Sequence, residues 1–86
     1  MFEWDEAKRA ANLAKHGVDF AAVHRLDWSS SLTARDGRTD YGEDRFVTLG
    51  IIDGRLHFCA WTLRAGRRRI ISLRKANRRE QAVFDP

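Results

Sequence analysis

The sequence has one cysteine, no long run of apolar residues and no internal repeat. Cys59 on its own cannot form an internal disulfide, and no spacing of cysteine and histidine predicts a zinc site. The apolar runs are too short for a membrane span, and the N-terminal stretch MFEWDEAKR is too acidic for a secretory signal peptide. We therefore expect a single domain over residues 1–86, cytoplasmic, with no metal ion and no cofactor.

What the chain does contain is typical of a small globular protein. Its 86 residues are 43% hydrophobic and 33% charged, which is near the globular average and argues against disorder. A chain of this length buries roughly 60–65% of its unfolded surface. The core is therefore modest, and helices and sheet must share it.

Positive charge is concentrated in the second half of the sequence. Residues 1–43 hold six basic and eight acidic side chains, whereas residues 44–86 hold ten basic and four acidic ones. Thirteen of the sixteen cations are arginines, whose planar guanidinium group matches phosphate oxygens in pairs. This distribution predicts a surface that faces a polyanion, although a solvated rim of arginines would give the same counts.

The hydrophobic pattern predicts helices first and strands afterwards. Asp5 and Gly17 are suited to begin and end a helix over residues 6–16, and Asp19 to begin a second over residues 20–26. From residue 28 onward the apolar period is two, which indicates strands. The predicted strands are residues 28–34, 45–52, 55–63 and 68–74.

Turn and cap motifs complete the predicted fold. Asp53-Gly54 is a hairpin motif between two of the strands. Asn77 with Glu80 resembles a capping box that opens a helix over residues 79–84. We predict the order ααββββα and an α+β fold, in which two N-terminal helices pack on a four-stranded antiparallel sheet with a short C-terminal helix.

The segment RRRIISLRKANRRE, residues 67–80, combines seven cations with an apolar centre. In a strand, side chains alternate between the two faces of the sheet. One set, expected to face the helices, consists of Arg69, Ile71, Leu73 and Lys75. The other set, expected to face outward, consists of Arg68, Ile70, Ser72 and Arg74. The strand is thus predicted to serve the core on one side and a cationic site on the other.

Six motifs in order carry a resemblance to a known family. They are FEWDEAK at 2–8, NLAKHGVDF at 12–20, YGEDR at 41–45, GR at 54–55, WTLR at 61–64 and RIISLRKANRRE at 69–80. Together they span nearly the whole chain, which resembles the BrnT-type toxins of bacterial type II toxin–antitoxin systems, a family with the fold of the RelE and ParE toxins. Two positions depart from the pattern: the family more often has a small residue in place of Leu73 and a tyrosine in place of Trp61.

The resemblance implies a ribonuclease toxin that halts translation and growth. It also implies neutralisation by a BrnA-type antitoxin with a ribbon-helix-helix DNA-binding part. Two toxin copies would then be held with their antitoxins on operator DNA as a 2:2 complex, and the isolated toxin would be a monomer.

RNA cleavage without a metal ion needs a positioned phosphate, a base, an acid and cations over the developing charge. Arg64 and Arg74 are predicted to clamp the phosphate, with Ser72 as a hydrogen-bonding group. Lys75 would add charge or donate a proton. Glu43 would act as the base, although it could instead pair with an arginine. Further RNA-binding residues are predicted to be Arg45, Arg67, Arg78 and Arg79.

The histidines and tryptophans are better explained by structure than by catalysis. His57 is mid-strand on the same face as Trp61, and His16 is at a helix end, where a cation suits the helix dipole. Trp4, Trp28 and Trp61 could stack on bases, but a core this small needs them for packing.

Two other functions are compatible with the same features. A ParE-like toxin would inhibit DNA gyrase by protein contact and would need no catalytic residues. The grouping of arginine, lysine and serine on one sheet face favours the ribonuclease over this alternative. A non-catalytic nucleic-acid-binding module would also explain the basic half of the chain. The sequence has neither an RNP-type aromatic pair nor a helix-turn-helix pattern, which disfavours such a module.

Overall fold

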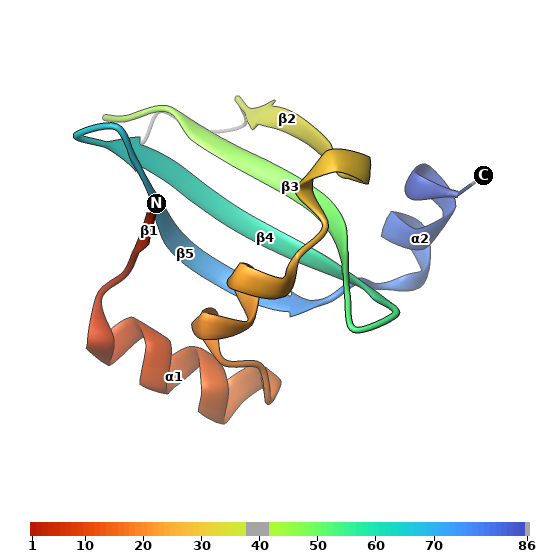
Figure 1. Cartoon of the computed structure of the whole chain (residues 1–86), viewed down its shortest axis with the longest axis horizontal. Helices are drawn as coiled ribbons and strands as arrows, with labels where there is room; N and C mark the ends of the chain where they lie inside the picture. The colour runs from red at the N-terminus through yellow and green to blue at the C-terminus, as the bar shows by residue number, and fades with distance from the viewer. Residues whose placement is uncertain (38–41, 86) are drawn as a thin grey trace.

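The computed structural model of the protein describes residues 1–37 and 42–85. Along the chain the elements are β1 (Phe2–Glu3), α1 (Glu6–His16), the 3-10 helices η1 (Phe20–Arg25) and η2 (Trp28–Ser30), β2 (Leu32–Asp36), β3 (Arg45–Ile52), β4 (Arg55–Arg64), β5 (Arg67–Lys75) and α2 (Arg78–Phe84). The strands form one sheet in the order β1-β5-β4-β3-β2 (Figure 1). No helix among the described residues has the length and the apolar composition that crossing a membrane would require.

The predicted packing of two N-terminal helices on a four-stranded antiparallel sheet is wrong. The sheet has five strands and is mixed, because β1 pairs in parallel with β5, with Phe2 opposite Arg68. A strand of two residues shows no hydrophobic period, so no pattern in the sequence reveals it. The N-terminal part contains one α-helix, α1, and the second predicted helix is the 3-10 helix η1.

Aspartate side chains impose tight turns on the chain after α1. Asp19 accepts a hydrogen bond from the N–H of Ala21 at the start of η1. Asp27 likewise accepts from the N–H and the hydroxyl of Ser29, which forms η2 where a strand was predicted to start. These aspartate side chains compete with regular backbone hydrogen bonding, so η1 and η2 are 3-10 helices, which are tighter than α-helices. As a result, β2 begins only at Leu32.

The predicted helix caps are confirmed. α1 spans Glu6–His16, with Asp5 capping its first turn and Gly17 ending it in the left-handed conformation at φ 71°. Asn77 and Glu80 form the capping box that begins α2. The hairpin turn between β3 and β4 is also as predicted, with positive φ at both central residues.

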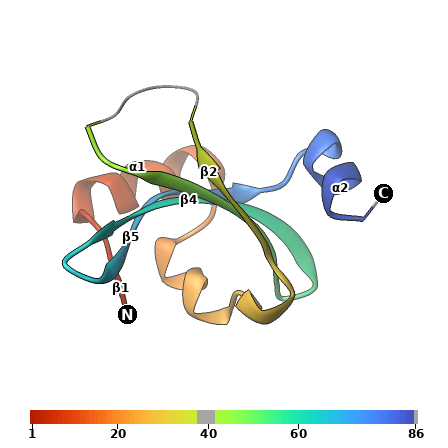
Figure 2. The same ribbon diagram turned by 90° about the horizontal axis from the view of Figure 1, so that it is seen from above.

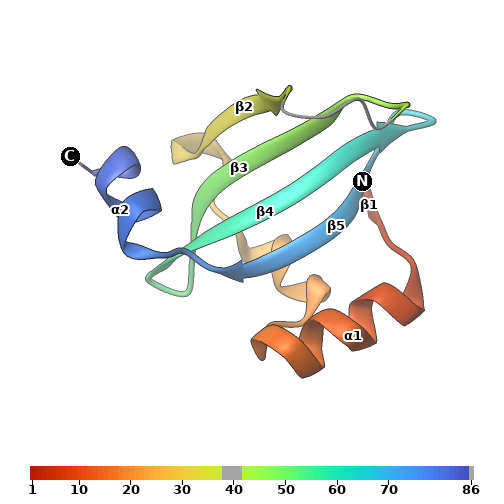
Figure 3. The same cartoon turned by 180° about the vertical axis from the view of Figure 1, so that it is seen from behind.

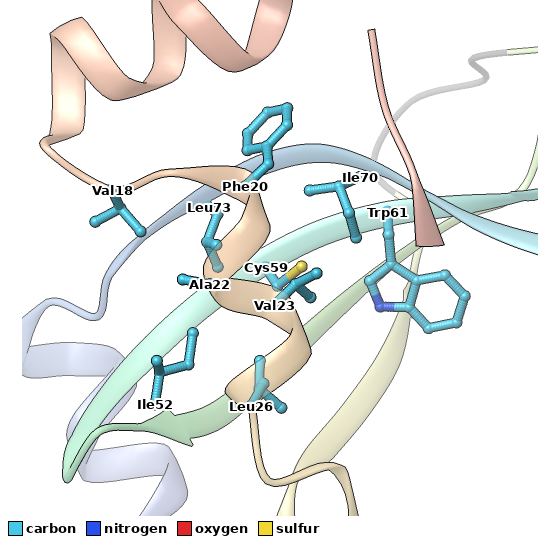
Figure 4. Close-up of a cluster of buried hydrophobic side chains, with 10 residues drawn as sticks. All are labelled: Val18, Phe20, Ala22, Val23, Leu26, Ile52, Cys59, Trp61, Ile70 and Leu73. Atoms are coloured by element: carbon cyan, nitrogen blue, oxygen red, sulfur yellow. The ribbon is translucent and has the colours of Figure 1, made fainter. Parts of the chain in front are cut away.

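One face of the sheet packs against η1 and η2 and carries the main core (Figures 1 and 2). Figure 4 shows how side chains of η1 meet those of the middle strands. Gly50 of β3 allows close packing here, since a Cβ atom at this position would lie 2.5 Å from Cδ2 of Leu26. The buried cluster consists of Val18, Phe20, Ala22, Val23, Leu26, Ile52, Cys59, Trp61, Ile70 and Leu73.

Asn12 joins α1 to the edge of β5. Its Nδ2 donates to the carbonyl oxygens of Leu73 at 2.7 Å and Val18 at 3.0 Å, and the Leu73 N–H donates to its Oδ1 at 3.2 Å. The buried amide therefore pairs with the β5 backbone as a neighbouring strand would, at a point that β1 does not reach. Nothing in the local sequence indicates this contact.

A bulge at Ile71 overturns the predicted alternation of faces in β5. Leu73 lies opposite Cys59, and Ile70 lies opposite Trp61. Between these two pairs β5 has two residues, whereas β4 has one, so β5 carries an extra residue. Ile70 is 1% exposed and Leu73 is 0% exposed, whereas Ile71 is partly exposed. The core side chains of β5 are therefore Ile70 and Leu73, not Ile71 and Leu73.

The bulge also exchanges the two neighbouring arginines. Arg68 lies on the core side, with its guanidinium 4.2 Å from the ring centre of Trp28. Arg69 is on the opposite side, where the alternation had placed Arg68. Ser72 and Arg74 follow the bulge and face away from the main core, as predicted.

The other face of the sheet is open in its centre, where no described helix crosses it (Figure 3). α2 covers one end only. There Leu49, Leu56 and Ala76 form a second apolar cluster, against which Phe58 and Phe84 pack. We call this side of the sheet the open face.

Candidate functional site

Strand register places small side chains in a row across the open face. Ala34 lies opposite Val47, and Val47 lies opposite Ala60. Ala60 in turn lies opposite Ser72. Residues directly opposite one another share a face of the sheet, so this central row runs from β2 to β5. Four strands spaced about 4.8 Å apart make the row about 14 Å long.

Larger and charged side chains lie on both sides of the central row. On one side Phe58 is opposite Arg74, and on the other Thr62 is opposite Arg45 in β3 and Arg69 in β5. Phe58 and Thr62 are four residues apart on β4, or about 13 Å, which suits a single polynucleotide strand. We call the central row with these two walls the sheet trough. A hollow of about 420 Å³ in it is lined by residues that include Ala34, Val47, Phe58, Arg74 and Glu80.

Arg74 is held firmly in its wall of the trough. Its Nη1 and Nη2 donate to the two carboxylate oxygens of Glu80 at 2.8 and 2.9 Å, and its guanidinium lies 4.1 Å from the ring centre of Phe58. The hydrogen bonds from Arg74 hold the pKa of Glu80 below its ordinary value of 4.5. An arginine has five N–H donors, and this one uses three, the third on the carbonyl of Lys75. It is therefore pre-oriented and still able to bind an anion.

Arg45 and Arg69 form the facing wall. Arg45 was predicted to bind RNA, and it lies at the start of β3, opposite Asp36 of β2. Arg69 was not predicted, and its Nη1 donates to Glu3 at 3.0 Å. The bulge alone brings it to this face.

The structure does not bring Arg64 and Arg74 together at one phosphate, where both were predicted to lie. Arg64 lies opposite Arg67 at the hairpin end of β4 and β5. Phe58 is the β4 partner of Arg74. Arg64 is six positions further along β4, a distance of about 20 Å. Glu43 lies at the same far end, with its carboxylate 3.5 Å from Nη2 of Arg64. The predicted base is therefore remote from Arg74.

A comparison with protein families finds a match over most of the chain. Residues 4–80 match the family described as the ribonuclease toxin BrnT of type II toxin–antitoxin systems. The chain belongs to the BrnT family. Membership makes it a ribonuclease toxin with a protein antitoxin as partner, and it confirms the resemblance of the motifs. A search of the curated proteins finds no significant match.

Lys75 of this BrnT toxin lies on the other face of the sheet from Ser72 and Arg74. It is opposite His57, which is 6% exposed. Nδ1 of His57 lies 2.8 Å from the carbonyl oxygen of Arg55, an acceptor, so Nδ1 carries a proton. His57 and Lys75 line a cavity of about 600 Å³ between η1 and the sheet. Lys75 therefore does not share a site with the other predicted catalytic residues.

Arg78 and Arg79 lie at the start of α2, beyond the end of the trough. Both are exposed, and neither forms an ion pair with a carboxylate in residues 1–37 or 42–85. Val83 of the same helix is 62% exposed. This end of the toxin offers free positive charge beside apolar surface.

The aromatic and thiol groups of the toxin belong to the packing. Trp61 is buried and donates its Nε1–H to the hydroxyl of Thr48 at 2.8 Å, and Trp28 stacks on Phe2. Burial raises the pKa of the Cys59 thiol to about 12, so it stays protonated and unreactive. In the described part of the chain, His, Cys, Asp and Glu form no group of three or more that could hold a metal ion.

Proposed function

We propose that this BrnT toxin cleaves single-stranded RNA in the sheet trough without a metal ion, and thereby halts translation and growth in the cytoplasm. The proposal rests on the position of three arginines, Arg45, Arg69 and Arg74, on both sides of a row of small side chains that ends at Ser72. The small residues leave room for a strand, and Arg74 is held in one wall by Glu80 and Phe58.

The reaction would use the RNA's own ribose hydroxyl as nucleophile. O2′ loses its proton and attacks phosphorus, while O5′ of the next nucleotide leaves and takes up a proton. The products are a 2′,3′-cyclic phosphate and a 5′-hydroxyl. Negative charge grows on the phosphate oxygens in the transition state, and cations fixed there beforehand stabilise it. Arg74 would supply this charge, and the Ser72 hydroxyl would donate to a phosphate oxygen.

We expect the purified toxin to cut RNA in the presence of EDTA and to leave 2′,3′-cyclic phosphate ends. Charge stabilisation by arginine needs no ion to be added. The measurement is end-group analysis of the fragments, with the same RNA carrying 2′-O-methyl groups as an uncleavable control. Activity that disappears in EDTA and returns with magnesium would rule out this mechanism, and so would cleavage of the methylated RNA.

We also propose a BrnA-type antitoxin with a ribbon-helix-helix part, bound as a 2:2 complex on operator DNA. An antitoxin segment with acidic and apolar side chains would suit the end of the toxin formed by α2. Arg78 and Arg79 provide charge there, and Arg78 borders a hollow of about 450 Å³ lined also by Ile51, Leu56 and Phe84. Ile70, by contrast, is buried and is not available for this contact.

Changing both Arg78 and Arg79 to alanine should weaken antitoxin binding about tenfold or more at low salt, mainly through slower association. The reason is that exposed charge steers association, and added salt screens it. Binding kinetics of the toxin with its antitoxin, measured over a range of salt, would test this. A control variant, Lys8→Ala with Lys15→Ala, removes the same charge from α1, away from α2. If the two double variants bind alike, the antitoxin does not dock on α2.

A further inference from the structure

A second basic group lies on α1, just beyond the β5 end of the sheet trough. Lys8, Lys15 and His16 line a hollow of about 250 Å³ together with Asn12, Ile71 and Ser72. Ser72 thus belongs both to the central row of the trough and to this hollow. We call the hollow the α1 pocket.

The charge in the α1 pocket is not neutralised within the described chain. The arginines Arg64, Arg69 and Arg74 on the open face each pair with a carboxylate. Neither Lys8 nor Lys15 forms such a pair in residues 1–37 or 42–85, and both are exposed. Asp5 caps α1 by accepting a hydrogen bond from the backbone N–H of Lys8, and this bond is the main cause of its lowered pKa. The charge of the Lys8 side chain contributes less to that lowering.

The side chains of the pocket are suited to a phosphate group. Two ammonium groups and a hydroxyl donate hydrogen bonds, and His16 carries at least one N–H donor in each of its protonation states. Lys8 and Lys15 are seven residues apart on α1, so two helical turns bring them to the same side of the helix. Asn12 fixes α1 to Leu73 of β5, so the helix and Ser72 cannot move apart freely.

We propose that the α1 pocket binds a backbone phosphate of the RNA, so that the substrate leaves the trough at Ser72 and continues over α1. This inference rests on the proposed function, because it assumes that RNA lies in the trough. It adds Lys8, Lys15 and His16 to the RNA-binding surface. All three lie in the first half of the sequence, outside the half in which positive charge is concentrated.

The test is the salt dependence of RNA binding with the full-length toxin. The probe is a short, labelled single-stranded RNA with 2′-O-methyl groups throughout, which binds but cannot be cut. Each phosphate contact of a single strand contributes about 0.7 to the slope of log affinity against log salt, so loss of the one phosphate contact in Lys8→Gln with Lys15→Gln should reduce the slope by about 0.7. The control Arg25→Gln with Arg55→Gln removes two charges away from the pocket and should leave the slope unchanged. Both variants replace exposed side chains, and thermal melts establish that they are folded.

Two results would overturn the α1 pocket. One is a slope that the Lys8 and Lys15 changes do not alter, and the other is an equal reduction in the control, which would mean a general effect of net charge. The readout does not depend on cleavage. A toxin that fails to cut RNA in EDTA, yet shows the reduced slope in the lysine variant alone, would lose the proposed mechanism and keep the pocket.

Discussion

Replacing Arg74 by alanine is expected to lower the rate of RNA cleavage by about 10²–10³-fold, as removal of a transition-state donor does in other enzymes. The same change should cost only about 1 kcal/mol of stability, because the ion pair with Glu80 lies near the surface. Steady-state cleavage of a short RNA and a thermal melt of the same preparation measure the two effects.

Glu80→Gln is the matched control for Arg74. It removes the ion pair but leaves the guanidinium in place, and glutamine can still accept the Asn77 N–H of the capping box. Its loss of stability should depend on pH. The pKa of Glu80 is lowered in the folded state, so its contribution is present above 4.5 and disappears as the pH falls below that value. The melting curves of the variant and the unmodified toxin should therefore converge in acid.

The two roles of Arg74 give different results in this pair of variants. If Arg74 binds the phosphate, cleavage falls steeply in Arg74→Ala and by only a few-fold in Glu80→Gln. Equal losses of cleavage, in proportion to equal losses of Tm, would make Arg74 a structural partner of α2 and would refute its role at the phosphate.

The second large effect is expected at the two adjacent isoleucines of β5. Ile70→Ala should lower the free energy of unfolding by about 2–5 kcal/mol, since the side chain is 1% exposed in the main core. Ile71→Ala should cost about 1 kcal/mol, because Ile71 is the bulged residue and is partly exposed. Chemical denaturation of both variants, with Leu73→Ala as a buried reference, gives the comparison.

The order of these two costs tests the bulge at Ile71. Strict alternation along β5 predicts the opposite order, with Ile71 in the core beside Leu73 and Ile70 exposed. A larger cost for Ile71→Ala than for Ile70→Ala would therefore contradict the bulge, and with it the position of Arg69 in the wall of the trough.

The candidate site was predictable from the sequence only in part. Ser72 and Arg74 follow the bulge, so simple alternation placed both on the open face correctly. Arg64 was grouped with them because both arginines end a strand, and only the strand register shows that these are opposite ends of the sheet. Lys75 was grouped with them by sequence proximity, but the next residue in a strand points to the other face.

The sequence by itself determined the features that depend on a few neighbouring residues. The caps of α1 and α2 and the hairpin turn are set by hydrogen bonds and φ preferences within about four residues, and the family motifs lie in continuous stretches. Tertiary structure alone decided the pairing of β1 with β5, the contact of Asn12 with Leu73 and the bulge at Ile71. Each of these satisfies backbone groups or buries side chains across distant parts of the chain. Their free energy arises only when those parts meet, so no local pattern encodes them.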